Sequence, residues 1–205
     1  MKWNFRHELR QDEFKNHEDL TLSYLLFTNE EITKEQINFE TFREVEFKRC
    51  KLDHVTFDNN FLGKVKFENC ELNNITFNGC NLSNVDFDNC KLINVSIFES
   101  TISNMSIEES IVEYSKIENT KIDNSIFEKV KFMDNIHRHN KYVYLKFAHC
   151  TFISDNFIDT NFKECDLKTS HFEEVKINLD ELITSKLSLL SLLEIVSAKG
   201  IIIEE

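Results

Sequence analysis

The chain has 205 residues, 41% hydrophobic and 12% aromatic, which is enough to bury the core of one domain or of one domain with an extension. Its formal charge of −12 argues against nucleic acid or an anionic membrane as a partner, because phosphate groups attract basic surfaces. A polar beginning and the lack of an apolar run of about 18–20 residues argue against a signal peptide or membrane span, so we expect a cytoplasmic protein with reduced thiols.

Residues 1–39 are expected to cap the N-terminal end of the fold. The stretch "TNEEITKEQI", Thr28 to Ile37, begins with a Thr-x-x-Glu box that predicts a short helix. Apolar residues of this segment continue a five-residue spacing found further along the chain: Leu22, Phe27, Ile32 and Ile37. That frame would direct Glu30 and Glu35 inward, so the sequence favours a cap without regular coils.

Between residues 40 and 179 an apolar residue returns at every fifth position. The only clearly polar residue in this series of centres is His137. The others are Phe42, Phe47, Leu52, Phe57, Leu62, Phe67, Leu72, Phe77, Leu82, Phe87, Leu92, Ile97, Ile102, Ile107, Val112, Ile117, Ile122, Phe127, Phe132, Tyr142, Phe147, Phe152, Phe157, Phe162, Leu167, Phe172 and Ile177. Neither a helix of period 3.6 nor a strand of period 2 produces this spacing.

A second series, of mostly small or β-branched residues, lies two positions before the centres. It contains all six cysteines: Cys50, Cys70, Cys80, Cys90, Cys150 and Cys165. Two inward residues separated by one outward residue describe a very short strand, after which polar residues turn a corner. Asn is frequent at the last position of the unit, and it tolerates left-handed backbone geometry. Asn therefore explains how a chain with three Gly and no Pro can turn so often.

This pattern resembles the pentapeptide-repeat family, whose loose motif has Leu or Phe at the centre, a small residue two before it and polar residues elsewhere. The resemblance implies an all-β solenoid: a right-handed quadrilateral β-helix of about seven coils over residues 40–179. Each five residues would form one side, and coils would stack at about the 4.8 Å strand spacing. The chain departs from the motif where Lys replaces the expected Asp or Asn before a centre, at Lys51, Lys66, Lys91, Lys116 and Lys121.

In such a fold, residues twenty apart stack on one side and residues ten apart face each other. Phe sides would then face Phe sides, and Leu sides would face each other with their thiols. Cys50, Cys70 and Cys90 would form a column. Their spacing lacks the close Cys pairs of zinc sites, so we expect buried structural thiols rather than a metal or redox ladder.

The stretch "NIHRHNKY" contains His137, the one clearly polar centre of the five-residue series, and two interpretations of it stay open. In quinolone-resistance members of the family, functional loops interrupt the coil. A ten-residue bulge or distorted coil between Asn135 and Tyr144 would be the counterpart here, formed by His137, Arg138, His139 and Asn140. The alternative is an imperfect repeat with an exposed basic tip. His137 and His139, with His149 or His171 helping, could also contribute to a metal site. The spacing specifies no acidic or thiol partner for them, so we predict no metal.

Residues 180–205 end in "SKLSLLSLLEIVSAKGIIIEE", which predicts a short apolar helix that stops at Gly200 and a brief strand at Ile201–Ile203. A helix this apolar must be buried against something. A similar helix in quinolone-resistance relatives makes a two-fold dimer, so the resemblance implies a homodimer. Its contact residues would be Leu189, Leu190, Leu192, Leu193, Ile195, Val196 and Ile202. The alternative is that the helix caps a monomer.

Acidic residues recur on the outer surface at the twenty-residue spacing. One column reads Lys48, Glu68, Asp88, Glu108 and Glu128, and Asp86 and Glu109 widen it. We call Glu68, Asp86, Asp88, Glu108, Glu109 and Glu128 the acidic strip. Two interpretations stay open: a solvated face that keeps the protein soluble, or a charge row that imitates a DNA backbone.

No catalytic triad pattern, Gly-rich phosphate loop or HExxH pattern occurs, so we expect neither an enzyme nor a cofactor. The resemblance implies a DNA mimic that binds DNA gyrase or topoisomerase IV and protects against quinolones or topoisomerase toxins, with no nucleic-acid or membrane partner. The alternative is a non-catalytic interaction scaffold with an unrelated partner. Apolar residues expected outside the tube favour it: Ile93, Phe98, Met133, Ile153 and Ile158.

Overall fold

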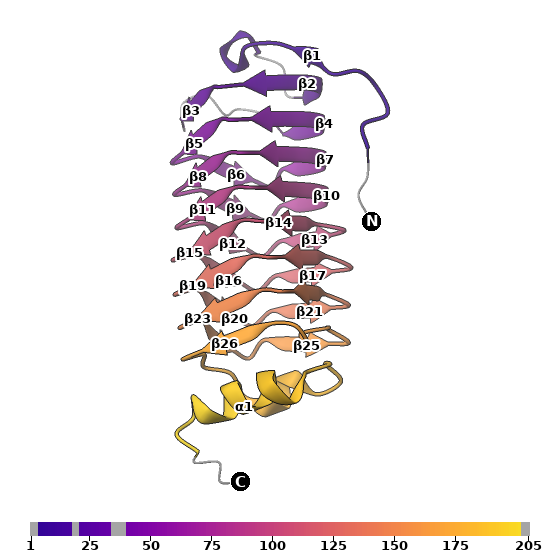
Figure 1. Ribbon diagram of the computed structural model, residues 1–205. Coiled ribbons are helices and arrows are strands. Elements are labelled where there is room, and N and C mark those ends of the chain that lie inside the picture. The colour runs from indigo at the N-terminus through magenta and orange to yellow at the C-terminus, as the bar shows by residue number, and fades with distance from the viewer. Residues whose placement is uncertain (1–3, 18–20, 34–39, 202–205) are drawn as a thin grey trace.

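One coil of the fold takes twenty residues. Phe47 pairs with Phe67 and Phe67 with Phe87, always between parallel strands. The computed structural model describes residues 4–17, 21–33 and 40–201, in which such coils stack into a parallel β-solenoid with α1 (Leu189–Ser197) at one end (Figure 1). The predicted all-β solenoid with a C-terminal helix is confirmed.

The described strands form three parallel sheets of 12, 8 and 6 strands. The first sheet covers two sides of the coil and comprises β1 (Arg10–Gln11), β2 (Thr21–Thr28), β4 (Thr41–Lys48), β7 (Phe61–Glu68), β10 (Asn81–Asp88), β13 (Thr101–Ser103), β14 (Ser106–Glu108), β17 (Lys121–Asp123), β18 (Ile126–Glu128), β21 (Lys141–Val143), β22 (Lys146–Ala148) and β25 (Asn161–Lys163). The second comprises β3 (Glu31–Thr33), β5 (Lys51–Asp53), β8 (Glu71–Asn73), β11 (Lys91–Ile93), β15 (Ile111–Glu113), β19 (Lys131–Met133), β23 (Thr151–Ile153) and β26 (His171–Glu173). The third comprises β6 (Thr56–Asp58), β9 (Thr76–Asn78), β12 (Ser96–Phe98), β16 (Lys116–Glu118), β20 (Ile136–Arg138) and β24 (Asn156–Ile158).

The corners of the coil are made by residues in the left-handed backbone region. Asn59, Asn89 and Asn124 have φ of 55°, 51° and 48°, as the Asn pattern predicts. Glu44 and Tyr114 adopt the same geometry with φ of 52° and 53°, although side chains of this size carry a steric cost there. The fold therefore imposes the corner on side chains of many kinds, with Thr169 an exception within the coils.

The centres of the five-residue units fill the interior of the tube. Phe47, Phe67 and Phe87 form one stack, with centroids 5.0 Å apart at each step and nearly parallel rings. On the facing side, Phe57 stacks on Phe77 at 4.8 Å. These side chains are at most 3% exposed, so the predicted layers of large residues are confirmed.

The series two positions before the centres supplies hydrogen bonds as well as small volume. Ser110 Oγ accepts from the Cys90 amide at 2.9 Å, and Asn135 Oδ1 accepts from the Ser115 amide at 2.8 Å. Each bond joins neighbouring coils and satisfies a buried backbone amide. Unpaired buried amides are costly, so polar side chains recur in this series for a physical reason.

The solenoid begins earlier than expected. Strands β2 and β3 continue the frame, and Leu22, Phe27 and Ile32 are buried within it. The helix predicted over Thr28–Ile37 is wrong where the chain is described, because β3 pairs with β5 along the stack. The rest of that prediction, residues 34–39, lies outside the described residues. Stacking on the next coil outweighs the local capping signal.

Of the two interpretations left open between Asn135 and Tyr144, the structure contradicts the loop and agrees with the imperfect repeat. Strand β20 pairs in register with β16 and β24, so the chain follows the ordinary coil there. His137 lies inside the tube, whereas His139 lies outside, where its Nδ1 is 3.4 Å from an Asp159 carboxylate oxygen. The two histidines point to opposite sides of the wall, which also removes the metal site considered for this pair.

A small polar cluster is buried inside the tube around His137. Its Nδ1 lies 2.7 Å from the Tyr142 hydroxyl, and its ring stacks on Phe157 at 4.3 Å. Burial lowers the pKa of His137 to about 3. Asp155 Oδ1 accepts from the Asn135 amide at 2.8 Å, and burial raises the pKa of Asp155 to about 7. His137 is therefore neutral above pH of about 3, and Asp155 is protonated below pH of about 7.

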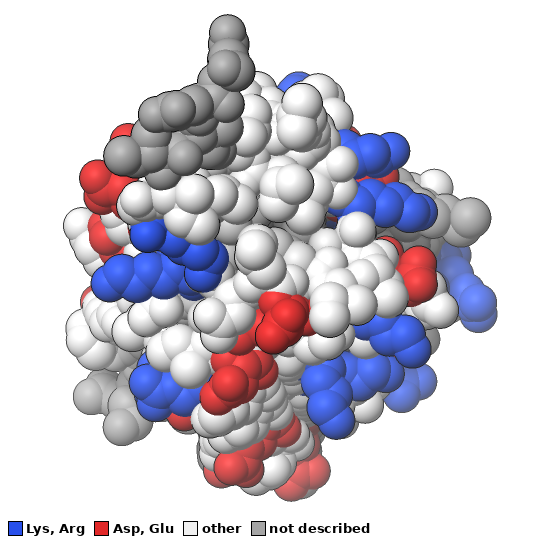
Figure 2. All heavy atoms as spheres, turned by 90° about the horizontal axis from the view of Figure 1, so that it is seen from below, with Lys and Arg blue, Asp and Glu red and all other residues white. Residues whose placement is uncertain are grey.

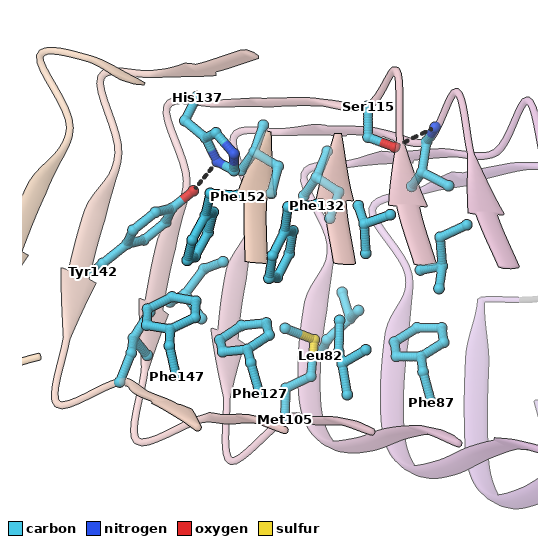
Figure 3. A pocket seen from close by; sticks show the side chains of 18 of the residues that line it. Leu82, Phe87, Met105, Ser115, Phe127, Phe132, His137, Tyr142, Phe147 and Phe152 are labelled. Carbon is cyan, nitrogen blue, oxygen red and sulfur yellow. Dashed lines mark hydrogen bonds between the residues drawn. The ribbon is translucent and has the colours of Figure 1, made fainter. Parts of the chain in front are cut away.

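The middle coils are lined by aliphatic rather than aromatic centres and enclose an apolar cavity of about 60 Å³. In Figure 3, aliphatic side chains lie between the rings of Phe87 and Phe127. Ile107 occupies the missing place in this stack, since it pairs with Phe87 on one side and Phe127 on the other. The aromatic column is thus interrupted where Ile replaces Phe.

Replacing Ile107 with Phe should complete the aromatic stack and fill part of the cavity. We expect stabilisation of about 1 kcal/mol, because residual cavity volume costs about 24 cal/mol per Å³. The reciprocal control, Phe67→Ile, opens a gap in a filled stack and should destabilise by roughly 1–3 kcal/mol. Thermal unfolding of both variants beside the parent measures this, and a loss of stability in Ile107→Phe would show that the coil is overpacked instead.

The raised pKa of Asp155 predicts a pH-dependent stability. Its folded pKa of about 7 lies above the unfolded value of about 4, so the stability associated with the neutral acid is complete below pH of about 4 and is lost as pH rises through 7. We expect a loss of roughly 2–4 kcal/mol, measured by denaturant unfolding between pH of about 5 and 8. Asp155→Asn, which retains the acceptor, should remove this loss, and the exposed Asp159→Asn should not. Equal pH profiles for all three chains would refute this assignment.

Candidate functional site

The acidic strip has the stacking that the sequence predicts. Strand pairing aligns Lys48 with Glu68, Glu68 with Asp88, and Asp88 with Glu108. The next pair in register is Glu108 and Glu128. A column of carboxylates therefore runs parallel to the solenoid axis along one side of the first sheet.

Lysines neutralise part of the strip, a feature that the twenty-residue spacing does not predict. Glu68 lies 2.6 Å from the Lys48 ammonium and 2.7 Å from the Lys66 ammonium, and these hydrogen bonds lower its pKa to about 2. Lys66 is also 4.0 Å from Asp88, and Lys129 is 2.8 Å from Glu109. The strip is therefore a mixed surface with an acidic excess rather than an unbroken row of negative charge.

A segment near the N-terminus lies beside the strip, along the edge of the coils (Figure 1). The Arg6 amide donates to Glu44 Oε2 at 2.9 Å, and His7 Nδ1 lies 3.7 Å from the same oxygen. A hollow of about 260 Å³ separates this segment from the strip. Its walls include Asn4, Phe5, Glu46, Lys66, Asp86, Asp88 and Glu108. No period in the sequence singles out residues 4–7, so sequence reasoning missed this contact.

The C-terminal end is closed by α1, whose first turn is capped by Ser188. The Ser188 hydroxyl accepts from the Ser191 amide at 3.0 Å, and Ser191 Oγ donates to the Ser170 carbonyl at 2.9 Å. Ile195 is fully buried against the last coil. Glu194 accepts from the Phe172 amide at 2.9 Å, so the helix also satisfies an amide at the open edge of β26.

The other face of α1 is apolar and exposed. Leu189, Leu190 and Leu192 are 74%, 55% and 38% exposed, and Ile183 nearby in sequence is 62% exposed. Much of this end carries neither acidic nor basic atoms (Figure 2). Leu193 and Val196 are half-buried, Gly200 has a left-handed φ of 78°, and Ile202 lies outside the described residues. The helix therefore covers the last coil with one face and leaves a second apolar face uncovered.

The six cysteines are buried and free. Cys70 Sγ donates to the Phe47 carbonyl at 3.3 Å, and Cys90 Sγ makes the equivalent bond to Phe67 one coil later at 3.4 Å. Burial raises the pKa of Cys150 to about 12 and that of Cys165 to about 11, which disfavours the reactive thiolate at neutral pH. The thiols pack as small buried side chains two positions before the centres.

Within the described ranges, His, Cys, Asp and Glu side chains form no group of three or more suited to holding a metal ion. Among the helices described, none is long and apolar enough to cross a membrane. The surfaces that remain as candidates for binding are the acidic strip and the exposed face of α1.

Comparison with known proteins agrees with this architecture. Residues 40–127 match a family model described as a pentapeptide repeat region. No curated protein matches the sequence. Solved structures of QnrB1, a plasmid-mediated fluoroquinolone resistance protein, are similar at 18% identity with a TM-score of 0.42, covering 88% of this chain and 99% of theirs, and at 15% with a TM-score of 0.45, covering 90% and 100%.

HetL, a pentapeptide-repeat protein involved in heterocyst differentiation regulation in the cyanobacterium Nostoc sp. strain PCC 7120, is similar at 10% identity with a TM-score of 0.32. That likeness covers 82% of this chain and 83% of HetL. Structural likenesses this weak assign no function. Residues 40–127 are therefore similar to a pentapeptide repeat region, and the five-residue coil with left-handed corners continues beyond them.

Proposed function

We propose that this chain is a DNA-mimicking protein that binds DNA gyrase or topoisomerase IV and protects the enzyme against quinolones or topoisomerase toxins. The target follows from the resemblance of the repeat and the C-terminal helix to the quinolone-resistance branch. The observation that carries the proposal is the acidic strip along the solenoid axis. This function requires no catalytic residue.

The charge density of the strip supports mimicry of a nucleic-acid backbone. Asp86, Asp88, Glu108, Glu109 and Glu128 belong to three successive coils. At about 4.8 Å per coil this amounts to one carboxylate per roughly 3 Å of axis, close to the ~3.4 Å spacing of phosphates along one DNA strand. Lys129 beside Glu109 reduces the net charge of that stretch.

The exposed face of α1 supports a homodimer joined at the C-terminal ends. The coils from Thr21 to Ile177 make a rod of roughly 38 Å at the ~4.8 Å spacing. Two rods end to end would exceed ~70 Å, comparable to about twenty base pairs of duplex at ~3.4 Å per step. Burying Leu189, Leu190 and Leu192 against a second copy would remove a large apolar surface from water.

A second candidate function is a protein-interaction scaffold with an unrelated partner. Lys48 and Lys66 beside Glu68 favour it, because a DNA mimic has no use for ammonium groups in its charge row. The apolar residues on the outer wall, such as Ile93 and Phe98, are half-buried and could extend such an interface. A gyrase assay separates the two functions.

The double variant Asp88→Lys/Glu108→Lys should weaken gyrase binding at least tenfold, since it reverses two adjacent charges of the strip and like charges across an interface cost several kcal/mol. Titration of labelled protein with purified gyrase measures this, and the parent affinity should fall as salt rises. The matched control, Glu113→Lys/Glu173→Lys, makes the same change in net charge on the second sheet and should bind normally.

The parent chain should also reduce quinolone inhibition in a gyrase supercoiling assay, and the strip variant should not. Unchanged supercoiling and unchanged drug inhibition with the parent would reject the gyrase target and favour the scaffold. Equal losses of binding in the strip variant and its control would mean that only total charge matters.

The variant Leu189→Glu/Leu190→Glu should convert a dimer into a monomer in sedimentation velocity experiments. Glu is well tolerated in the first turn of a helix, so α1 should still form. Tyr114→Glu, at a site 58% exposed on a middle coil, is the control and should leave the dimer intact. A parent chain that sediments as a monomer would show that α1 only caps the coil.

A further inference from the structure

The segment of residues 4–7 is fastened to the solenoid at one corner. The Arg6 amide donates to Glu44 Oε2 at 2.9 Å, and the Lys64 ammonium lies 3.1 Å from Glu44 Oε1. The His7 ring meets Tyr24 edge-on at 4.7 Å between centroids. Burial opposes ionisation of Glu44, but the Arg6 amide and Lys64 outweigh it and hold the pKa below its ordinary value. Glu44 is therefore an ionised latch.

Glu44 owes its burial to this segment. It is 6% exposed, although it occupies a left-handed corner of the kind that elsewhere faces solvent. Glu164, six coils further along the same corner column with a φ of 54°, is exposed. The two residues share chemistry and backbone geometry. They differ in whether a segment lies over them and in the residue one coil later, which is Lys64 for Glu44 and Thr184 for Glu164.

From this corner the segment extends over the side of the first sheet that carries the acidic strip. Asn4 and Phe5 form one wall of the 260 Å³ hollow, and Asp86, Asp88 and Glu108 contribute to the opposite wall. A partner surface that approaches these carboxylates must therefore displace the segment or bind around it. Its Arg6 brings a positive charge to the same neighbourhood.

We propose that residues 4–7 form a displaceable strap that competes with the basic partner for the acidic strip. This inference rests on the proposed function, because it assigns a regulator to the same surface. The strap is fastened mainly through one carboxylate, so a partner that supplies several cationic groups can displace it. The apparent Kd of the strapped chain would then equal the intrinsic Kd divided by the fraction of time that the strip is open.

The latch is tested first without a partner. Hydrogen exchange at the Arg6 amide reports on this segment, because that amide donates to Glu44. Glu44→Ala should speed exchange of the Arg6 amide about twofold or more, as expected when a fastened segment becomes open to solvent. Glu164→Ala, the matched corner control, should behave as the parent. Equal exchange rates in all three chains would overturn the latch.

The competition is tested with purified gyrase. Glu44→Ala and a chain lacking residues 1–9 should each bind about three- to tenfold more tightly than the parent, as for a strip that is covered about 70–90% of the time. Glu164→Ala should bind as the parent does. If the parent binds gyrase and the unstrapped chains bind no more tightly, the strap is wrong and the proposed function stands. If no chain binds gyrase, the proposed function fails, and the competition fails with it.

Discussion

The structure depends on the left-handed corner that returns every fifth residue. Corner amides then donate to carbonyls one coil away, as from Asn69 to Asp88 at 2.9 Å and from Asn89 to Glu108 at 3.0 Å. These bonds fix the register between coils, and the register decides which side chains enter the tube. Because the interval is constant, a residue's position within twenty determines its side, its depth and its stacking neighbours. Even Glu44 and Tyr114, which prefer other backbone geometry, take the corner.

The narrow interior then limits which polar groups the wall can contain. A hydroxyl or amide oxygen two positions before a centre accepts from the buried amide of the equivalent residue one coil earlier, as Ser110 and Asn135 do. A polar residue at a centre must find its partner inside the tube, where His137 bonds to the Tyr142 hydroxyl. Asp155 is the exception among these acceptors, because a carboxylate brings a charge that this environment disfavours. A charge buried in this core is therefore costly.

The periodic features could be predicted from the sequence, and the aperiodic ones could not. The inward centres, the Asn corners and the alignment of Glu68, Asp88 and Glu108 all follow from counting in fives and twenties. The capping signal at Thr28 predicted a helix wrongly, because a local propensity was outweighed by pairing along the stack. The contact between Arg6 and Glu44 joins residues 38 apart, a separation that does not fit the five-residue spacing, so no sequence pattern predicts it. Lys48 and Lys66 could be placed near Glu68 from the repeat, but the ion pairs that both make with Glu68 could not be predicted.

The features that distinguish one solenoid from another lie where the repeat is modified or stops. Inner coils share one backbone geometry, so their surfaces differ mainly in which residue occupies each outward position. The ends are different, because an open coil edge must be covered by a segment with its own fold. Here α1 uses Ser191, Glu194 and Ile195 to close the last coil, which leaves its leucines for another surface. At the other end, the segment that reaches Glu44 lies over a side of the tube rather than its edge, so it screens a column instead of closing a coil. A solenoid with a regular backbone can thus bind a specific partner because its terminal segments determine which columns of outward-facing residues are accessible.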